Sequence, residues 1–370
     1  MPSGSTLNHP AQQVIPPQKS EQAMKDDEEL RKMIAETQAK ICVIGAGGGG
    51  TNTVQRLNEV GIEGGVTYAV NTDAQALLHI NAHRKILIGK QLTRGLGAGS
   101  DPSVGESAAR ESEAEIKSLL QGMDLVFITC GLGGGTGTGA APVIAQIAKS
   151  MNALTVGVVT LPFTVEGRNR VENALEGLNR LRKEADTVII IPNDKILEIA
   201  PDLPVNAAFR VADEVLVNAV KGITEMVTKP GLINLDFADL RTILSKGGPA
   251  LIGLGESKAD KASDARALEA VENALTSPLL DVDISDANRA LINVIGGTDM
   301  TLREAEMIVE VVGSRINPNA HIIWGAMVDE TMPRSQIQAM VVIAGGKIPF
   351  LDGSNRVQQD KIDLGIEFTE

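Results

Sequence analysis

The sequence has little that would support nucleic-acid binding, membrane insertion or export. It carries 34 lysines and arginines against 47 aspartates and glutamates, a formal net charge of −13. Binding to a phosphate backbone needs clustered positive charge and stacking on bases needs aromatic side chains, yet aromatics are only 2% of the residues. The sequence shows neither an apolar run of roughly eighteen residues nor a signal-peptide layout. We therefore expect a cytoplasmic protein with no nucleic-acid partner and no direct insertion into a membrane.

Cysteine is also scarce. Cys42 and Cys130 each lie beside an apolar, strand-like run, which is typical of small core residues in a reducing compartment rather than of a disulfide. The length of 370 residues suits about two domains, each with its own core. Neither domain would need a covalent cross-link to fold.

The pattern along the chain predicts an α/β fold. Short β-branched runs alternate with helical patterns from Lys40 onward, and this alternation is typical of a parallel sheet with helices on both faces. Helices are expected from Thr51, near 104–121, from 140 and from 167. The predicted organisation is a disordered arm (1–20) with a short charged helix (21–38), a larger α/β domain (39–230), a smaller α/β domain (231–350) and a tail (351–370).

A long helix is predicted at the end of the first domain. Residues 206–228 carry an apolar stripe at helical spacing, and Lys229-Pro230-Gly231 is a stop signal. Further helices are expected near 261–275 and 301–315.

The stretch CGLGGGTGTGA, residues 130–140, follows an apolar strand and precedes a predicted helix. Strand, glycine loop and helix is the order in which a parallel sheet presents backbone N–H groups to a phosphate. Pro142 is expected in the first turn of that helix. A P-loop would need a lysine where Ala140 stands, so a Walker NTPase is disfavoured, and the phosphate charge must be met by backbone dipoles and a divalent cation.

Two more glycine runs could close around the same polyphosphate. Gly45, Gly47 and Gly50 match G-x-G-x-x-G, which alone is a weak signal for a dinucleotide. A dinucleotide site typically has an acidic residue at the end of the second strand to bind the ribose, and Asn71 stands at that position. A nicotinamide-dependent oxidoreductase is therefore a less favoured alternative. A third run begins at Gly95. Tight turns between elements are the purely structural interpretation of all three.

Several motifs along the chain resemble those of one protein family. GGGTGTG, ICVIGAGGGGTNTV, AVNTDAQAL, GLGAGSDPSVG, PFTVEGRNR, IPND and GLINLDFADL resemble the FtsZ family of the tubulin superfamily, in its archaeal form, over about residues 38–348. The resemblance implies the tubulin/FtsZ fold, with a long central helix between two domains. It also implies a cytoskeletal GTPase that polymerises into protofilaments and scaffolds the division ring at mid-cell.

The resemblance further implies a set of nucleotide-binding residues, with GTP as substrate, GDP as product and Mg²⁺ as cofactor. They are Gly48, Gly49, Gly50, Thr51, Asn52, Asp73, Gly97, Ala98, Gly99, Gly133, Gly134, Gly135, Thr136, Gly137, Thr138, Gly139, Glu166, Arg170, Asn193, Phe209 and Asp213. Thr51 stands where bacterial members have a glycine.

Several of these residues have a simpler alternative. Asp213 matches the family position whose carboxylate accepts both N1–H and N2–H of guanine, but it could instead compensate a helix dipole. Asn193 could read the same edge. Phe209 would stack on the base or belong to the core. Glu166 and Arg170 would lie near the ribose and phosphates or form an ordinary i,i+4 ion pair.

The catalytic residues are expected in Asn234-Leu235-Asp236-Phe237-Ala238-Asp239, where Asn234, Asp236 and Asp239 could orient a water. Asp236 and Asp239 also suit the first turn of a helix as structural residues. The long helix spans ~30 Å, so the two carboxylates cannot reach their own nucleotide. The resemblance implies that they enter the next subunit's pocket, which couples hydrolysis to head-to-tail assembly.

Other sites have less support. His79 and His83 have the spacing of a helical metal pair, but a surface pair is the favoured interpretation, and no metal site formed by protein ligands is expected. No Ser-His-Asp or Cys-His arrangement is evident. The tail ending in DLGIEFTE is expected to bind a membrane adaptor or other division proteins. A non-hydrolysing paralogue or filament regulator is the remaining alternative.

Overall fold

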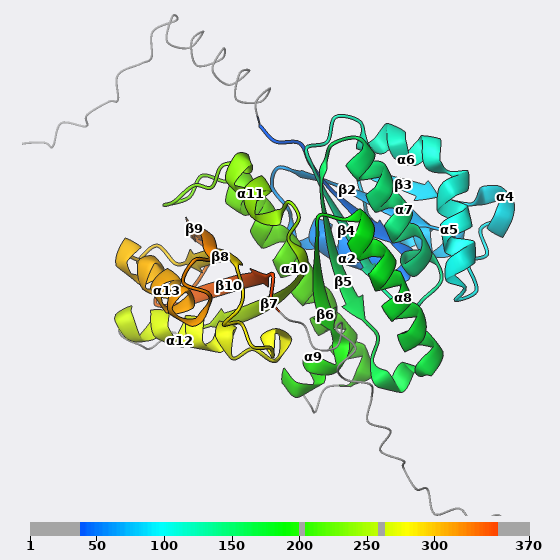
Figure 1. Cartoon of the computed structure of the whole chain (residues 1–370). Coiled ribbons are helices and arrows are strands. Elements are labelled where there is room, and N and C mark those ends of the chain that lie inside the picture. Colours follow the sequence, from blue (N-terminus) through cyan, green and yellow to red (C-terminus); the bar gives the residue numbers. More distant parts are fainter. Residues whose placement is uncertain (1–37, 200–203, 258–262, 347–370) are drawn as a thin grey trace, which may run out of the picture. The chain divides into compact units, whose positions relative to one another are not determined.

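The computed structural model describes residues 38–199, 204–257 and 263–346 of the chain (Figure 1). The predicted arm, nearly all of the predicted charged helix and the predicted tail lie outside the described residues.

The N-terminal half contains a parallel sheet of six strands in the order β3-β2-β1-β4-β5-β6. Its strands are β1 (Ile41–Ala46), β2 (Gly65–Asn71), β3 (Arg84–Leu87), β4 (Leu125–Gly131), β5 (Leu154–Leu161) and β6 (Thr187–Pro192). The central strands β1 and β4 are almost entirely buried, which explains their continuous apolar runs. Ile44 lies opposite Tyr68 on one side and Ile128 on the other.

Helices connect these strands, as the alternation predicted. They are α2 (Gly47–Val60), α3 (Ala74–His79), α4 (Lys90–Thr93), α5 (Pro102–Glu111), α6 (Glu113–Leu120), α7 (Thr136–Ser150), α8 (Arg168–Glu184) and α9 (Asn193–Ile199), with a short 3₁₀ turn, η1 (Thr164–Glu166). The prediction of a single helix over 104–121 is wrong, because α5 and α6 are separate helices that meet at Ser112. The Ser112 hydroxyl accepts a hydrogen bond from the N–H of Gly89.

Two helices begin earlier than predicted. The helix expected from Thr51 begins at Gly47, and the helix expected from 140 begins at Thr136, so both include glycines that were expected in loops. Close packing explains the second case, since a Cβ on Gly139 would lie 2.0 Å from the carbonyl oxygen of Pro102 in α5. Pro142 therefore lies inside α7 and not in its first turn. Its missing N–H leaves the carbonyl of Thr138 without the usual partner four residues on.

The long helix predicted over 206–228 is α10 (Val205–Thr228), with 24 residues. Its buried stripe includes Val215, Leu216, Ala219, Val220 and Ile223. It packs on α2 and β5 with one part of its surface and on the C-terminal strands β8 and β9 with another. Figure 1 shows it between the two groups of strands, and the helix packs against both groups.

The C-terminal half contains a mixed group of strands in the order β7-β10-β8-β9. Its elements are α11 (Phe237–Leu244), β7 (Gly248–Glu256), α12 (Ser263–Leu275), η2 (Pro278–Leu280), β8 (Arg289–Gly296), α13 (Leu302–Arg315), β9 (His321–Val328) and β10 (Ile337–Ala344). Strand β10 runs antiparallel to β7 and β8, whereas β8 and β9 are parallel. Residues 187–189 of β6 pair with 248–250 of β7, so the strands of the two predicted domains form one hydrogen-bonded sheet.

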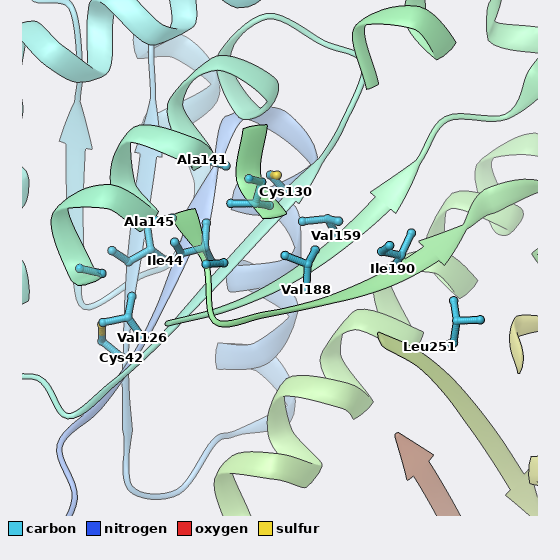
Figure 2. Packing of buried hydrophobic residues seen from close by; sticks show 14 of the residues in the cluster. Cys42, Ile44, Val126, Cys130, Ala141, Ala145, Val159, Val188, Ile190 and Leu251 are labelled. Atoms are coloured by element: carbon cyan, nitrogen blue, oxygen red, sulfur yellow. The ribbon is translucent and has the colours of Figure 1, made fainter. Parts of the chain in front are cut away.

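The core follows this sheet from one half into the other. One apolar cluster runs from Cys42 and Ile44 through Val126, Val159 and Ile190 to Leu251 in β7, as Figure 2 shows. Both cysteines are free and buried, and burial raises the pKa of each thiol, to about 12 for Cys130. Within the described part of the chain no helix is both long and apolar enough to cross a bilayer.

Candidate functional site

The glycine runs meet at one edge of the sheet. Because β1 to β6 are all parallel, their carboxyl ends lie at the same edge, and each is followed by a segment with predicted site residues. Gly48 to Asn52 follow β1, Asp73 follows β2, Gly97 to Gly99 lie between α4 and α5, and Gly133 to Gly139 follow β4. Glu166 and Arg170 follow β5, and Asn193 follows β6.

The loops touch each other through their glycines. Gly47 has a φ of +70°, in the left-handed region, and a Cβ there would lie 2.7 Å from the backbone nitrogen of Gly137. A Cβ on Gly135 would lie 2.8 Å from the nitrogen of Asp101. Only glycine permits these contacts. The expectation that the three glycine runs gather at one place therefore agrees with the geometry.

Other glycines face open space instead. A Cβ on Gly48, Gly99 or Gly134 would have no described atom within 4 Å. Gly48 and Gly134 also have backbone angles that other residues adopt, since neither has a positive φ. The fold itself does not demand glycine at these two positions. A side chain at either position would meet no described atom.

Threonine hydroxyls cross-link the loops. Thr72 Oγ1 and Thr136 Oγ1 are 2.6 Å apart and buried, which joins the end of β2 to the first turn of α7. The N–H of Gly133 donates to Thr138 Oγ1 at 2.9 Å. Thr51 donates to the carbonyl of Gly48 at 3.0 Å, within its own helix. The contact between Thr72 and Thr136 thus links two of the segments, and the other two bonds lie within single segments. We call the segments 47–52, 72–73, 97–99 and 133–139 together the cradle.

The segment after β2 holds the third run in place. The N–H of Gly97 donates to the carbonyl of Thr72 at 3.1 Å, and Ala98 is buried with its carbonyl bonded to the N–H of Asp101. Asp73 forms the N-cap of α3 by accepting from the N–H of Ala76 at 3.0 Å. The structure thus gives Asp73 a capping role at the edge where the resemblance places it beside phosphates.

A cavity of about 490 Å³ lies beside this cradle. It is lined by Asn52, Gln55, Arg56, Glu59, Arg210, Asp213 and Glu214. Burial raises the pKa of Asp213 to about 6, although a hydrogen bond from Thr53 and the charge of Arg56 lower it and Glu214 raises it. A carboxylate in this setting is stabilised by paired N–H donors from a ligand, which is what guanine offers.

Two neighbouring residues present suitable partners for a base. Phe209 is 40% exposed, and its ring meets that of Phe163 edge-on, with centroids 5.1 Å apart and planes at 85°. Phe163 is buried, whereas Phe209 is partly exposed and packs against it. Phe209 is therefore not a fully buried core residue. Asn193 is buried, and its Oδ1 accepts no hydrogen bond from the described residues.

Glu166 and Arg170 form the i,i+4 ion pair that their spacing allowed. Glu166 Oε1 also accepts from the N–H of Phe163 at 2.9 Å, which places the carboxylate next to the aromatic pair. The side chain of Arg170 is 47% exposed.

The predicted catalytic residues lie at the opposite edge of the sheet. Thr228, at the end of α10, donates to the carbonyl of Glu63 at 2.9 Å, just before β2 begins, and Arg241 donates to Asn152 before β5 begins. The 24 residues of α10 span roughly 36 Å. Asp213 is the ninth residue of α10, and the fifteen residues from it to Thr228 still span roughly 22 Å. Asp213 and the acids that follow the helix are therefore too far apart to act on one molecule of ligand.

Within this loop the acids also have structural partners. Asp236 caps α11 by accepting from the N–H of Asp239 at 2.8 Å, and Asn234 accepts from the N–H of Gly231 at 2.6 Å. Asn234, Asp236 and Asp239 are all exposed. Asp236 therefore caps α11 while its carboxylate and that of Asp239 remain exposed.

The histidine pair is not helical. Helix α3 ends at His79, and His83 lies beyond it, with Nδ1 2.7 Å from Thr67 Oγ1. Among the described residues no group of three or more His, Cys, Asp or Glu side chains could hold a metal ion.

A second cavity, of about 550 Å³, lies between α10 and the C-terminal strands. Glu225, Lys229 and Asn293 line it, and Asn293 Oδ1 is buried without a described partner. None of the predicted nucleotide or catalytic residues is among its lining residues, so it belongs to neither site.

Sequence reasoning missed three residues that the structure brings to the cradle. Thr53 and Thr72 contact Asp213 and Thr136, and Phe163 supports Phe209. Thr53 lies in the motif ICVIGAGGGGTNTV and Phe163 in PFTVEGRNR. Their position in these motifs was the only feature of the sequence that could have indicated a role at the site. Their partners are far away in sequence, and that part could not be read from a local pattern.

Comparison with known protein families places two models on the chain. The model "Tubulin/FtsZ family, GTPase domain" matches residues 40–201, and the model "FtsZ family, C-terminal domain" matches residues 248–347. The first covers the carboxyl-edge loops up to α9, and the second covers the strands β7 to β10.

Individual relatives are similar over most of their length. The chain is 59% identical over 324 residues to cell division protein FtsZ 1 of Thermococcus kodakarensis, which covers 88% of this chain and 85% of that protein. It is 56% identical over 341 residues to FtsZ 1 of Methanocaldococcus jannaschii, which covers 92% of each. A solved structure described as an empty FtsZ dimer from M. jannaschii matches with a TM-score of 0.82 at 56% identity, covering 86% of this chain and 92% of the other.

Proposed function

The chain belongs to the tubulin/FtsZ family, and from this premise we propose that it binds GTP in the carboxyl-edge cradle and hydrolyses it between subunits. It is a GTPase that assembles head to tail into filaments, as members of this family do. The observation that carries the residue-level proposal is the separation of the glycine cradle from Asp236 and Asp239 by most of the length of α10.

The cradle would hold the phosphates through its backbone. Gly48 and Gly134 leave open space against the backbone, and the first turn of α7 at Thr136 directs free N–H groups toward the same edge. These donors and the helix dipole offset part of the phosphate charge without a lysine. The contact between Thr72 and Thr136 pre-organises this geometry, which lowers the cost of binding.

Mg²⁺ would enter with the nucleotide. Because no acidic metal cluster exists among the described residues, the cation would be held mainly by phosphate oxygens and water, which suits its preference for octahedral oxygen ligands. The cation would neutralise charge on the phosphates.

The base would be read on the other side of the cradle. The Asp213 carboxylate accepts the two parallel N–H donors of guanine, which adenine lacks, and Asn193 supplies a further acceptor. Phe209 offers an exposed ring for stacking.

Hydrolysis would need a second copy of the chain. Asp236 and Asp239 project from the opposite edge, where a head-to-tail neighbour would bring them to the γ-phosphate and orient the attacking water. A contact of this type is heterologous and does not close, so it yields a filament. Assembly thereby completes the active site.

The cellular role follows as a proposal. The chain would scaffold the division ring at mid-cell on the cytoplasmic side of the membrane. The acidic-apolar end of the sequence, DLGIEFTE, would bind a membrane adaptor or other division proteins; these residues lie outside the described part of the structure.

The test is the rate of phosphate release from GTP and Mg²⁺ as a function of protein concentration. We expect a concentration threshold below which turnover is negligible, because an isolated subunit lacks the acids for its own pocket. A rate per subunit that is constant down to the lowest concentration would contradict catalysis between subunits.

Two further measurements separate the alternatives. Titrations with GTP, ATP and NAD should show binding of GTP alone, whereas binding of NAD without GTP would indicate the oxidoreductase. Light scattering in the same assay should rise with GTP and fall as it is consumed. Filaments without phosphate release would indicate a non-hydrolysing paralogue.

A further inference from the structure

Thr53 connects the two helices that form the base side of the candidate site. It lies in α2 and is fully buried, and its side chain faces α10. Its hydroxyl oxygen is 3.1 Å from the carbonyl oxygen of Gly49 and 3.4 Å from Asp213 Oδ1. The single hydroxyl proton is therefore shared between the backbone of its own helix and the carboxylate across the interface.

Asp213 needs a fixed orientation to recognise guanine. The terminal torsion of an aspartate is broad, so the plane of a carboxylate without a partner is poorly defined. Two parallel N–H donors are accepted well only when both carboxylate oxygens lie in the plane of the base. A donor on Oδ1 restricts that rotation.

We propose that Thr53 is a positioning residue for guanine recognition, whose hydroxyl holds the Asp213 carboxylate so that both oxygens face the base. This inference rests on the proposed function of the cradle, and it assigns the preference for guanine to a pair of residues rather than to Asp213 alone.

The charges around Asp213 support the same role. Burial disfavours the carboxylate and raises its pKa to about 6, whereas the hydrogen bond from Thr53 lowers the pKa. The charged groups that line the same cavity are Arg56 and Glu59 on α2 and Arg210 and Glu214 on α10; Arg56 lowers the pKa and Glu214 raises it. Thr53 thus also helps to keep Asp213 charged, and a protonated Asp213 could accept only one of the two donors.

A purely structural role for the hydroxyl has a matched example in the same protein. Thr224 is buried in α10, and its hydroxyl donates to the carbonyl of Val220 at 2.8 Å, four residues back in its own helix. This is the same local bond that Thr53 makes to Gly49. The variant Thr224→Val therefore controls for the loss of a buried helical hydroxyl.

The experiment compares GDP and IDP binding by calorimetry to the nucleotide-free full chain between pH 5 and 8. IDP lacks the N2–H donor of guanine. For Thr53→Val we expect GDP affinity at pH 7.5 to fall about three- to tenfold and IDP affinity to fall less, so the GDP/IDP ratio decreases. The pH below which GDP affinity declines should move upward, because removal of the hydroxyl raises the pKa of Asp213.

Rescue and turnover separate positioning from stability. Thr53→Ser keeps the hydroxyl and should restore both the ratio and the pH profile, while Thr224→Val should leave both unchanged. At saturating GTP, Thr53→Val should reach the wild-type turnover rate with a raised KM. If Thr53→Val does not fold, Thr53→Ala against Thr53→Ser gives the same comparison.

The outcomes are distinguishable. A wild-type GDP/IDP ratio and pH profile in a folded Thr53→Val variant would overturn the inference and leave the proposed function intact. A wild-type chain that does not prefer GDP over ADP would overturn the proposed function, and the inference with it.

Discussion

Thr72 and Thr136 are joined by a contact of 2.6 Å between their hydroxyl oxygens, which connects the end of β2 to the first turn of α7. Both residues are buried, and they are 64 positions apart in the sequence. The two loops expected to hold phosphates from different sides are thus fixed relative to each other by side chains.

Thr72→Val should loosen the cradle. The variant leaves the buried hydroxyl of Thr136 without this partner, which should lower the free energy of unfolding by about 1 to 3 kcal/mol. GTP affinity should fall as well, because the loops are less ordered before binding. Urea denaturation and calorimetry measure the two effects. Thr276→Val removes an exposed hydroxyl that bonds within its own helix end and should change neither; equal effects in both variants would reject the special role of Thr72.

Gly48→Ala and Gly50→Ala should separate binding from folding. A Cβ at position 48 meets no described atom within 4 Å, whereas at position 50 it would lie 2.2 Å from the carbonyl oxygen of Thr129. Gly48→Ala should therefore keep the wild-type Tm and lose GTP affinity at least about tenfold. Gly50→Ala should fail to fold, which circular dichroism would detect. Wild-type GTP affinity in Gly48→Ala would show that no ligand approaches there.

Asp236→Asn should abolish turnover while GTP binding persists. Asparagine also caps helices, so α11 should remain intact and the effect should come from the lost charge. Mixing this variant with Asp213→Ala should restore some phosphate release, because the second chain lends its acids to the first chain's intact pocket. Asp264→Asn, which neutralises an exposed carboxylate in α12, should behave as wild type. No recovery in the mixture would count against catalysis between subunits.

Asp213→Asn should stabilise the nucleotide-free protein in a pH-dependent way. The folded pKa of about 6 is higher than the ordinary value of 3.8, so the folded state holds its proton more tightly than the unfolded state. The ionised carboxylate therefore destabilises the fold fully above about pH 6, and this penalty fades as the pH falls toward 4. Asparagine avoids the penalty, so the variant should gain about 1 to 3 kcal/mol at pH 8.

Denaturation of both proteins from pH 8 down to pH 5 checks this prediction. The advantage of Asp213→Asn should shrink over that range, since wild-type Asp213 becomes protonated. A constant difference, or one that grows as the pH falls, would mean that burial does not raise the pKa. The variant should also bind GDP less tightly, so the gain in stability and the loss of affinity should appear together.

Much of the fold could be predicted from local pattern. The alternation of β-branched runs and helical stripes predicted the strands, and the stripe over 206–228 predicted α10 almost to the residue. Two of the errors occurred at glycine runs: α2 and α7 begin at Gly47 and Thr136, inside runs expected to be loops. A third occurred at Ser112, where the helix predicted over 104–121 is interrupted. Propensity disfavours glycine in helices, but close packing between α5 and α7 requires residues without side chains at positions 105 and 139.

The candidate site could also be predicted only in part. Glycine runs after strands indicated a phosphate site, and the length of α10 indicated that Asp236 and Asp239 lie far from it. The partners of the site residues were not predictable. Phe163 steadies Phe209, and Thr53 reaches Asp213 across 160 positions of sequence. No periodicity links such pairs.

By itself the sequence indicated the strands and most of the longer helices, where glycine runs follow strands, and that a long helix separates Asp236 and Asp239 from those runs. These features depend on turn chemistry and on spacing within a single element. Only the tertiary structure decided that β6 and β7 join two groups of strands into one sheet, and that Thr53 and Thr72 hold Asp213 and Thr136. Such contacts depend on how distant segments pack, because burial, not sequence proximity, brings their hydroxyls and carboxylates together.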